Sequence, residues 1–322
     1  MMEVRIINND QMPSYDKFVM EHGGVFNSSD WKKNVHGDKL VYYGIYEKED
    51  LIGIFQLYFA KQFGFTFIKN PPFIPNIGLV FKNRAVNDAN NLSFIKEIME
   101  TVTSFINKLP FSVLSIALPN NIIDTQTFFW NKYKVVPNYT YVHSLAESEE
   151  EIEKRFSPKT RNGITKAEKD NVEVKPCNDN NIVKQLIKNT FSRKGEGYDE
   201  ALVDKILFNF ATPENSFAFV AYFESKPVAV SFCLYDKNVA YYCLGGYDHK
   251  SGHRGAGVMC IQNSIMYCKK MGLKIFDFEG SMIPEVESYF RSFGPKMLPY
   301  FTINKAKMPF EIILKFIKRE KF

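Results

Sequence analysis

A short segment in the second half of the chain has the residue types and the order that phosphate binding needs. The run VAYYCLGGYDHKSGHRGAGVMCIQNSIMYCKKMG (239–272) reads as a strand, a loop containing glycine and then a helix. Gly255 and Gly257 permit close approach of a ligand to the backbone, the N–H groups of a helix start attract phosphate, and Arg254 adds a fixed positive charge. A loop that uses glycine only for tight turning is the alternative. The order of strand, arginine, glycine pair and helix favours phosphate binding.

Carboxylates lie on both sides of this segment. Asp277 and Glu279 alternate in the run FDFEG, so both are expected on one face of a strand. Asp248 ends the strand that precedes the loop. Because a carboxylate can take a proton from an attacking nucleophile, Asp248 and Glu279 are the predicted general bases. Asp277 is expected to cap a turn or form an ion pair inside the fold.

Groups that could stabilise developing charge belong to the strand before the loop. The backbone N–H groups of Leu244, Gly245 and Gly246 are predicted to meet the donor molecule and its oxyanion. Tyr242 is predicted to protonate a leaving group, with Tyr247 as a second candidate, whereas most strand tyrosines only pack.

The segment resembles the pyrophosphate loop of GNAT acyltransferases, whose pattern is Arg/Gln-x-x-Gly-x-Gly/Ala. Arg254 and Gly257 match this pattern, and Met259 departs from its small final residue. The resemblance implies that an acyl-CoA, for example acetyl-CoA, is the donor. It implies contacts from Arg254, Gly255, Ala256, Gly257 and Val258.

A larger part of the chain is similar to the FemAB-like branch of that superfamily, in which two GNAT-like domains are fused. The similarity rests on residues 140–174, the loop above, FDFEGS (276–281) and YFRSFGPK (289–296). Lys159 and Arg161 match a Lys-x-Arg of that branch, where basic residues hold a phosphorylated acceptor or donor. Solvent-exposed basic residues are the alternative reading.

A weak internal repeat indicates how these residues are positioned. Both halves contain two strands joined by a charged turn, then a helix, then a strand. The paired segments are 41–59 with 218–236, Leu92–Asn107 with Ala256–Met271, and 111–118 with 273–280. The predicted fold class is therefore α/β with mixed sheets, as tandem duplicated GNAT-like domains.

The expected boundary between the domains is near residue 147. Ser148 with Glu151 fits a capping box that opens a helix, and Ser157 with Pro158 fits the start of a second helix. Residues 1–147 are predicted to bind the acceptor or to serve a structural role. Residues 148–322 are predicted to hold the cofactor loop.

Composition restricts the partners. The chain has 322 residues, 45% of them hydrophobic, and a net charge of +5. This charge is too small to indicate DNA binding. Five cysteines without a CxxC pair, and no signal segment or membrane span, lead us to expect a cytoplasmic protein. No Cys/His quartet has ligand spacing, and His249 and His253 are four residues apart in a loop and not on a helix, so no metal is expected.

The last residues, MPFEIILKFIKREKF (308–322), form an amphipathic helical pattern. Packing against the rest of the protein is the default expectation. Peripheral membrane contact is the second, and it would suit a lipid-linked acceptor.

Three functions remain open at this point. The first is transfer of an acyl group to an amine, such as an amino sugar in cell-envelope or surface-polysaccharide synthesis. The second is aminoacyl transfer from tRNA in building peptidoglycan bridges, which the mild charge disfavours. The third is a non-catalytic GNAT-like binding module.

Overall fold

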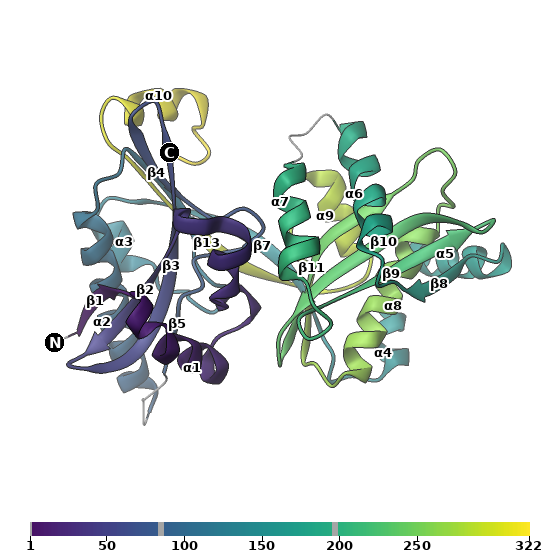
Figure 1. Cartoon of the computed structure of the whole chain (residues 1–322), viewed down its shortest axis with the longest axis horizontal. Helices are drawn as coiled ribbons and strands as arrows, with labels where there is room; N and C mark the ends of the chain where they lie inside the picture. Colours follow the sequence, from purple (N-terminus) through teal and green to yellow (C-terminus); the bar gives the residue numbers. More distant parts are fainter. Residues whose placement is uncertain (1, 83–86, 195–198) are drawn as a thin grey trace. The chain divides into compact units, whose positions relative to one another are not determined.

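The structure is a computed structural model, and it describes residues 2–82, 87–194 and 199–322 (Figure 1). The chain divides into two units, one of Met1–Asn138 with Pro299–Phe322 and one of Tyr139–Leu298. Each unit is a mixed α/β structure with a sheet at its centre.

The first unit has the strand order β1-β2-β3-β4-β6-β13, and β5 pairs with β3. Its strands are β1 (Met2–Ile6), β2 (Leu40–Glu47), β3 (Asp50–Gln62), β4 (Phe65–Lys69), β5 (Val80–Phe81), β6 (Val113–Ala117) and β13 (Lys296–Ala306). Its helices are α1 (Met12–His22), α2 (Asp88–Lys108), α3 (Gln126–Trp130) and α10 (Phe310–Ile317), with single turns at Asn9–Gln11, Val25–Asn27, Lys32–His36 and Gly37–Lys39. The buried side of α2 carries Ile98, Val102 and Ile106, as its helical spacing predicts.

The second unit has the order β8-β9-β10-β11-β12-β7. Its strands are β7 (Lys134–Ser144), β8 (Glu173–Pro176), β9 (Ser216–Phe223), β10 (Lys226–Tyr235), β11 (Val239–Tyr247) and β12 (Ile275–Asp277). Its helices are α4 (Glu149–Lys154), α5 (Pro158–Lys169), α6 (Asn180–Lys194), α7 (Glu200–Asp204), α8 (Ala256–Lys270) and α9 (Pro284–Arg291), with a π-helical turn at Lys205–Phe210.

Helices α8 and α6 cover opposite faces of the second sheet (Figure 1). The hydroxyl of Ser231 on β10 lies 2.8 Å from that of Ser264 on α8. On the other face, a Cβ atom added to Gly246 of β11 would meet the α6 backbone at Leu186, 2.5 Å away. The sheet therefore places β11, the strand that leads into the predicted phosphate loop, at the centre of a three-layer unit.

The predicted duplication is confirmed by strand order. The hairpin β2–β3 corresponds to β9–β10, and the parallel pair β4–β6 corresponds to the parallel pair β11–β12. Both hairpins have tight turns with positive φ, at Lys48 in the first and at Glu224 and Ser225 in the second. Such turns match the twist of antiparallel strands.

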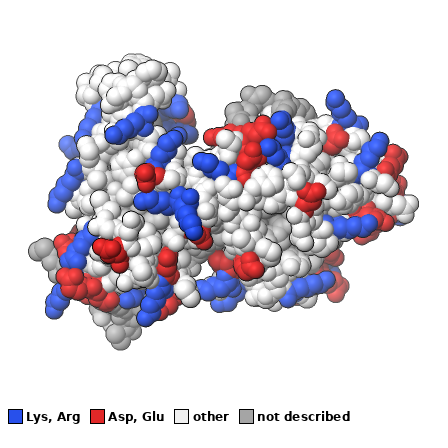
Figure 2. Space-filling view, in the orientation of Figure 1, with Lys and Arg blue, Asp and Glu red and all other residues white. Residues whose placement is uncertain are grey.

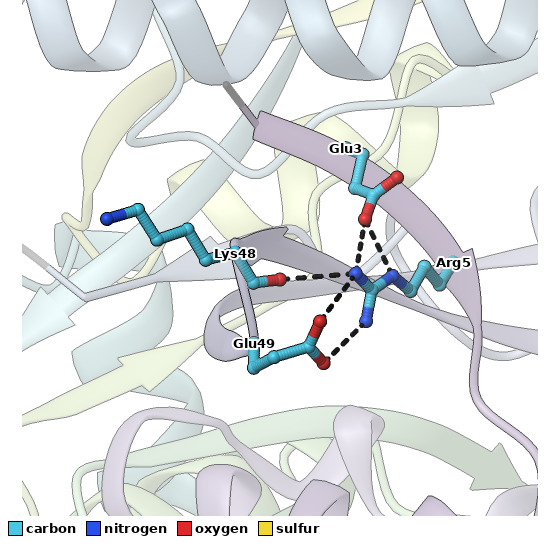
Figure 3. A network of polar contacts seen from close by, with 4 residues as sticks. All are labelled: Glu3, Arg5, Lys48 and Glu49. Atoms are coloured by element: carbon cyan, nitrogen blue, oxygen red, sulfur yellow. Dashed lines mark hydrogen bonds and ion pairs between the residues drawn. The ribbon is translucent and has the colours of Figure 1, made fainter.

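The turn of the first hairpin is fixed by one arginine (Figure 3). Arg5 on β1 donates hydrogen bonds to the carboxyl of Glu49 at 3.0 Å and to the carbonyl of Lys48 at 3.2 Å. It also pairs with Glu3 on its own strand. The edge strand and the β2–β3 turn are thereby joined on the surface.

The observed units differ from the predicted division at residue 147. The capping box of Ser148 and Glu151 and the Ser157–Pro158 helix start are both present. The division nevertheless falls at residue 138, and residues 299–322 join the first unit. The reason is that β13 pairs antiparallel with β6, with Thr302 opposite Ala117, whereas β7 pairs with β12.

Candidate active site

The start of α8 has the features that an anion site requires. The N–H groups of Gly257 and Val258 have no acceptor among the residues that the structure describes, whereas that of Ala256 bonds to the carbonyl of His253 at 2.9 Å. Arg254 is exposed and forms no ion pair with a described carboxylate. A helix start with unpaired N–H groups beside a free cation attracts phosphate.

The two glycines of this loop have different neighbours. A Cβ atom on Gly255 would lie 2.3 Å from the carbonyl oxygen of Gly163 on α5, so this glycine permits helix packing. A Cβ atom on Gly257 would meet only the hydroxyl of Tyr289, at 3.3 Å. Gly257 is therefore the glycine that leaves room for close approach of a ligand. Gly255 is required because α5 packs closely against α8 at this position.

Met259 does not obstruct the loop, although it departs from the small residue of the family pattern. Its N–H bonds to the carbonyl of Gly255 at 3.0 Å, and its side chain is buried in the core of the second unit. Ala256 is also buried there, and Val258 packs against the same core.

The loop before α8 is held by its own polar side chains. His253 accepts a hydrogen bond at Nδ1 from the N–H of Gly255 at 3.1 Å, and its Nε2 lies 2.9 Å from the carboxyl of Asp170. Both ring nitrogens of His253 are thus engaged. His249 stacks edge-on against Tyr247, at 4.7 Å between ring centres. In the described parts of the chain, no group of three His, Cys, Asp or Glu residues could hold a metal ion.

Asp248 belongs to this loop structure. Its carboxyl accepts hydrogen bonds from the hydroxyl of Ser251 at 2.5 Å and from the N–H of Lys250 at 2.9 Å. These hydrogen bonds, that of Ser251 first, lower the pKa of Asp248. A carboxylate with a lowered pKa is a weak base, so the geometry favours Glu279 over Asp248 in that role.

Strands β11 and β12 separate where the site lies. They pair in parallel only from Val239 with Ile275 to Tyr241 with Asp277, yet β11 continues to Tyr247. A bulge in the β10–β11 ladder leaves Cys243 without a partner residue. The second half of β11 therefore has an edge that no described strand covers.

Glu279 lies just beyond the end of β12. Its φ is +58°, and Gly280 follows with +68°, so the chain turns away at this point. The expected alternation of Asp277 and Glu279 along one strand is therefore wrong, because β12 ends at Asp277. A non-glycine residue in this conformation costs about 1–3 kcal/mol, and outside tight hairpin turns such residues cluster at functional sites.

The carboxyl of Glu279 is in an unusual electrostatic position. Its Oε1 lies 3.5 Å from the Sγ of Cys243. Burial, and after it the charge of Asp277, raises the pKa of Glu279 to about 8. Such a carboxyl is partly protonated at neutral pH and can exchange a proton with a substrate.

Asp277 organises the turn that presents Glu279. It accepts hydrogen bonds from the hydroxyl of Thr140 at 2.5 Å and from the N–H of Glu279 at 2.8 Å. Burial raises its pKa to about 6. This is the capping role that the sequence favours for Asp277.

Tyr242, the predicted acid, lies against the glycines of its own strand. A Cβ atom on Gly245 would lie 1.9 Å from the Tyr242 hydroxyl, so Gly245 provides the space for this ring. Burial raises the pKa of Tyr242 well above its usual value. The hydroxyl therefore stays protonated and can donate a hydrogen bond, but it is a weak acid for complete proton transfer. Leu244 is buried, so it can offer a ligand only its backbone.

Arg161 has structural contacts. Its guanidinium donates to the backbone carbonyls of Lys154 at 3.0 Å and Phe156 at 2.5 Å, which closes the end of α4. Lys159 is exposed and forms no ion pair among the described residues. The two basic residues thus differ, and only Lys159 is free to meet an acceptor.

Two residues of the site were not predicted. Cys243 occupies the bulge, which cannot be seen in a strand-like sequence. Tyr289 faces Gly257 from α9, and the run YFRSFGPK that contains it gives no sequence signal for this contact.

Comparisons with known proteins agree with this architecture. Residues 159–291 match the family described as acetyltransferase (GNAT) domain. Among solved structures, FemX gives a TM-score of 0.67 at 12% identity, over 98% of this chain and 99% of that chain. L-PGS from Bacillus licheniformis gives 0.57 at 12% identity, over 98% of both chains. A tandem GNAT protein from the clavulanic acid biosynthesis pathway gives 0.50 at 9% identity, over 95% and 98%.

The chain thus has a GNAT acyltransferase fold. More narrowly, the whole chain has a FemAB-like fold of two GNAT-type domains in tandem, and the match to the family model covers residues 159–291. A search of curated protein sequences finds no match. In the described residues, no helix is long and apolar enough to cross a membrane.

Proposed function

We propose that the protein transfers an acyl group from acyl-CoA to an amine, with Glu279 as the general base. The observation that carries this proposal is the position of Glu279, whose pKa is raised to about 8, beside the edge where β11 and β12 separate. A general base is most effective when its pKa lies near the working pH.

The donor would bind at the start of α8. The N–H groups of Gly257 and Val258 point out of the helix end, and Arg254 supplies a charge that can pair with a pyrophosphate. Because β11 and β12 are parallel, the loop after β11 and Glu279 after β12 lie at the same edge of the sheet. The uncovered edge of β11 could pair with the extended arm of the donor.

The reaction needs no covalent enzyme intermediate. The amine nitrogen attacks the thioester carbonyl carbon, and Glu279 takes the proton that the nitrogen loses. The new C–N bond turns the carbonyl into an oxyanion, which backbone N–H groups near Leu244 can stabilise. The carbonyl then re-forms, the C–S bond breaks, and sulfur leaves with the electron pair while Tyr242 donates a hydrogen bond to it.

The acceptor class that we favour is an amino sugar used in cell-envelope or surface-polysaccharide synthesis. Lys159 is the residue that we assign to a phosphate on that acceptor, because its ammonium is exposed and unpaired in the described structure. Aminoacyl-tRNA is the alternative donor. We retain this alternative because the fold is similar to that of FemX.

Calorimetric titration with acetyl-CoA, longer acyl-CoAs and charged tRNA tests the donor. We expect an acyl-CoA to bind and Arg254→Ala to weaken it. Binding of charged tRNA alone would favour the alternative. If no donor binds, the protein is a GNAT-like module without transferase activity. Where an acyl-CoA binds, the acceptor is identified by adding candidate amines and measuring the release of free thiol from the acyl-CoA.

A further inference from the structure

Large apolar side chains are exposed together at one end of the first unit. Phe63 and Phe65 lie at the turn between β3 and β4, and the ring of Phe65 packs edge-on against Phe310 of α10, at 4.7 Å between ring centres. Figure 1 shows α10 beside this turn. We call the following set the apolar tip: Phe63, Phe65, Ile312, Ile313, Phe316 and Ile317.

The exposure in the apolar tip is extreme. Phe63 is 88% exposed and Phe316 is 86% exposed, and α10 contains no buried residue. Phe63 also has a φ of +50°, a conformation that a phenylalanine rarely adopts. Neither packing nor turn geometry within the unit explains a phenylalanine there.

Helix α10 does not pack tightly on the sheet below it. A cavity of about 490 Å³ separates it from β3, β4 and β6, and the lining is mainly apolar. The helix spans eight residues, which is about 12 Å and far less than a bilayer core of about 30 Å. It can therefore lie in a membrane interface but cannot span the bilayer.

Positive charges surround the apolar tip. Lys69, Lys318 and Lys321 line the cavity beneath α10, and none of them forms an ion pair with a described carboxylate. The acid Glu311 on α10 is already paired with Lys315 at 2.6 Å. Figure 2 shows uncharged atoms at the end of this unit with lysine and arginine directly below them.

We propose that the apolar tip docks on the surface of a bilayer that contains anionic lipids. Apolar side chains would enter the acyl boundary while the lysines meet the phosphates of the headgroups. The lysines around the apolar tip favour an anionic bilayer over a second copy of the chain, because a second copy would place the same lysines opposite one another. The inference does not depend on the donor or the reaction.

Sedimentation with lipid vesicles tests this docking in the full-length protein. We expect binding to phosphatidylcholine vesicles that contain phosphatidylglycerol, little binding to phosphatidylcholine alone, and weaker binding at high salt. Phe63→Asn with Phe316→Gln should abolish binding. Lys318→Glu with Lys321→Glu should weaken it at least about twentyfold, because each basic residue near such a surface contributes about fivefold.

Matched controls separate docking from misfolding. Ile123 and Phe129 of the first unit are 72% and 71% exposed, so Ile123→Asn with Phe129→Gln removes equivalent apolar surface elsewhere. Lys270→Glu with Lys274→Glu provides the charge control on the second unit. Both controls should bind like the native protein, and all variants should keep its melting temperature.

Two results would overturn the proposal. One is equal binding of the tip variants and the native protein. The other is absence of binding of the native protein to vesicles that contain phosphatidylglycerol. A native dimer, seen by analytical ultracentrifugation, that the tip variants lose would then assign the apolar tip to contact with a second copy of the chain.

Discussion

The Sγ of Cys243 lies 3.5 Å from the Oε1 of Glu279, although the two residues are 36 positions apart. Cys243 occupies the bulge of β11, and Glu279 occupies the turn with positive φ after β12. Two irregular positions on neighbouring strands thus meet. The bulge at Cys243 and the turn at Glu279 together place the carboxyl of Glu279 beside the unpaired edge of β11.

Replacing Glu279 by glutamine should remove the general base. We expect the rate of acyl transfer to fall about 10²–10⁴-fold, while acyl-CoA affinity stays unchanged. Steady-state kinetics with the accepted amine measures the rate, and calorimetry measures the affinity. Asp248→Asn is the control, and a larger loss of rate in that variant would assign the base to Asp248.

Glu279 should also reduce stability at high pH. The pKa in the folded state is about 8 against 4.5 for the free group, so burial penalises the ionised form. The melting temperatures of Glu279→Gln and the native protein should coincide below about pH 4.5. The variant should then become relatively more stable as pH rises to about 8, and the difference should level off above it. A constant difference across that range would show that the carboxyl is not buried as described.

Arg254→Ala should weaken acyl-CoA binding by about 1.5–3 kcal/mol, since a charge-assisted contact to phosphate is lost. The melting temperature should not change, because Arg254 is exposed and has no ion pair among the described residues. Arg254→Lys should restore part of the affinity. Unchanged affinity of the alanine variant would place the donor elsewhere.

The two glycines of the loop should respond oppositely to alanine. Gly255→Ala forces a Cβ to 2.3 Å from the Gly163 carbonyl, so it should cost about 1–3 kcal/mol of folding free energy. Gly257→Ala meets only a tyrosine hydroxyl at 3.3 Å and replaces glycine within a helix, so it should stabilise by up to about 1 kcal/mol. Despite this gain, Gly257→Ala should bind acyl-CoA less tightly. Chemical denaturation and calorimetry together check the pair.

Arg161→Ala should lower stability by about 0.5–1.5 kcal/mol, because two carbonyls at the end of α4 lose their donor. The acceptor KM should stay as it is. Lys159→Ala should show the reverse pattern, with a higher acceptor KM and a native melting temperature. If Arg161→Ala instead raises the acceptor KM at constant stability, its guanidinium contacts the acceptor after all.

Much of the fold is visible in the sequence because it depends on local patterns. The hairpins, the α2 periodicity at Ile98 and Val102, and the strand–loop–helix around Arg254 are all confirmed. The succession of hairpin, helix and strand in both halves is confirmed as well. By contrast, the pairing of β13 with β6 joins Asn304 to Ser115, 189 positions apart, and no local signal marks such a pairing.

The site was less predictable, because its residues are distinguished by their neighbours. Gly255 and Gly257 look alike in a loop pattern, and only the approach of Gly163 separates packing from ligand contact. Asp248 and Glu279 likewise look equivalent until Ser251 lowers the pKa of one and burial raises that of the other. The sequence therefore marks the region, and tertiary contacts distinguish the residues within it.

The division of the chain also fixes the order in which the protein can be completed on the ribosome. Residues 139–298 are continuous, so this unit has all its strands as soon as it has emerged. The unit that begins at the N-terminus must wait for β13, since its last strand is made after the whole of the other unit. Domains usually finish folding in the order in which they are synthesised. In this chain the first unit starts to be synthesised first, but its sheet is completed after that of the second unit.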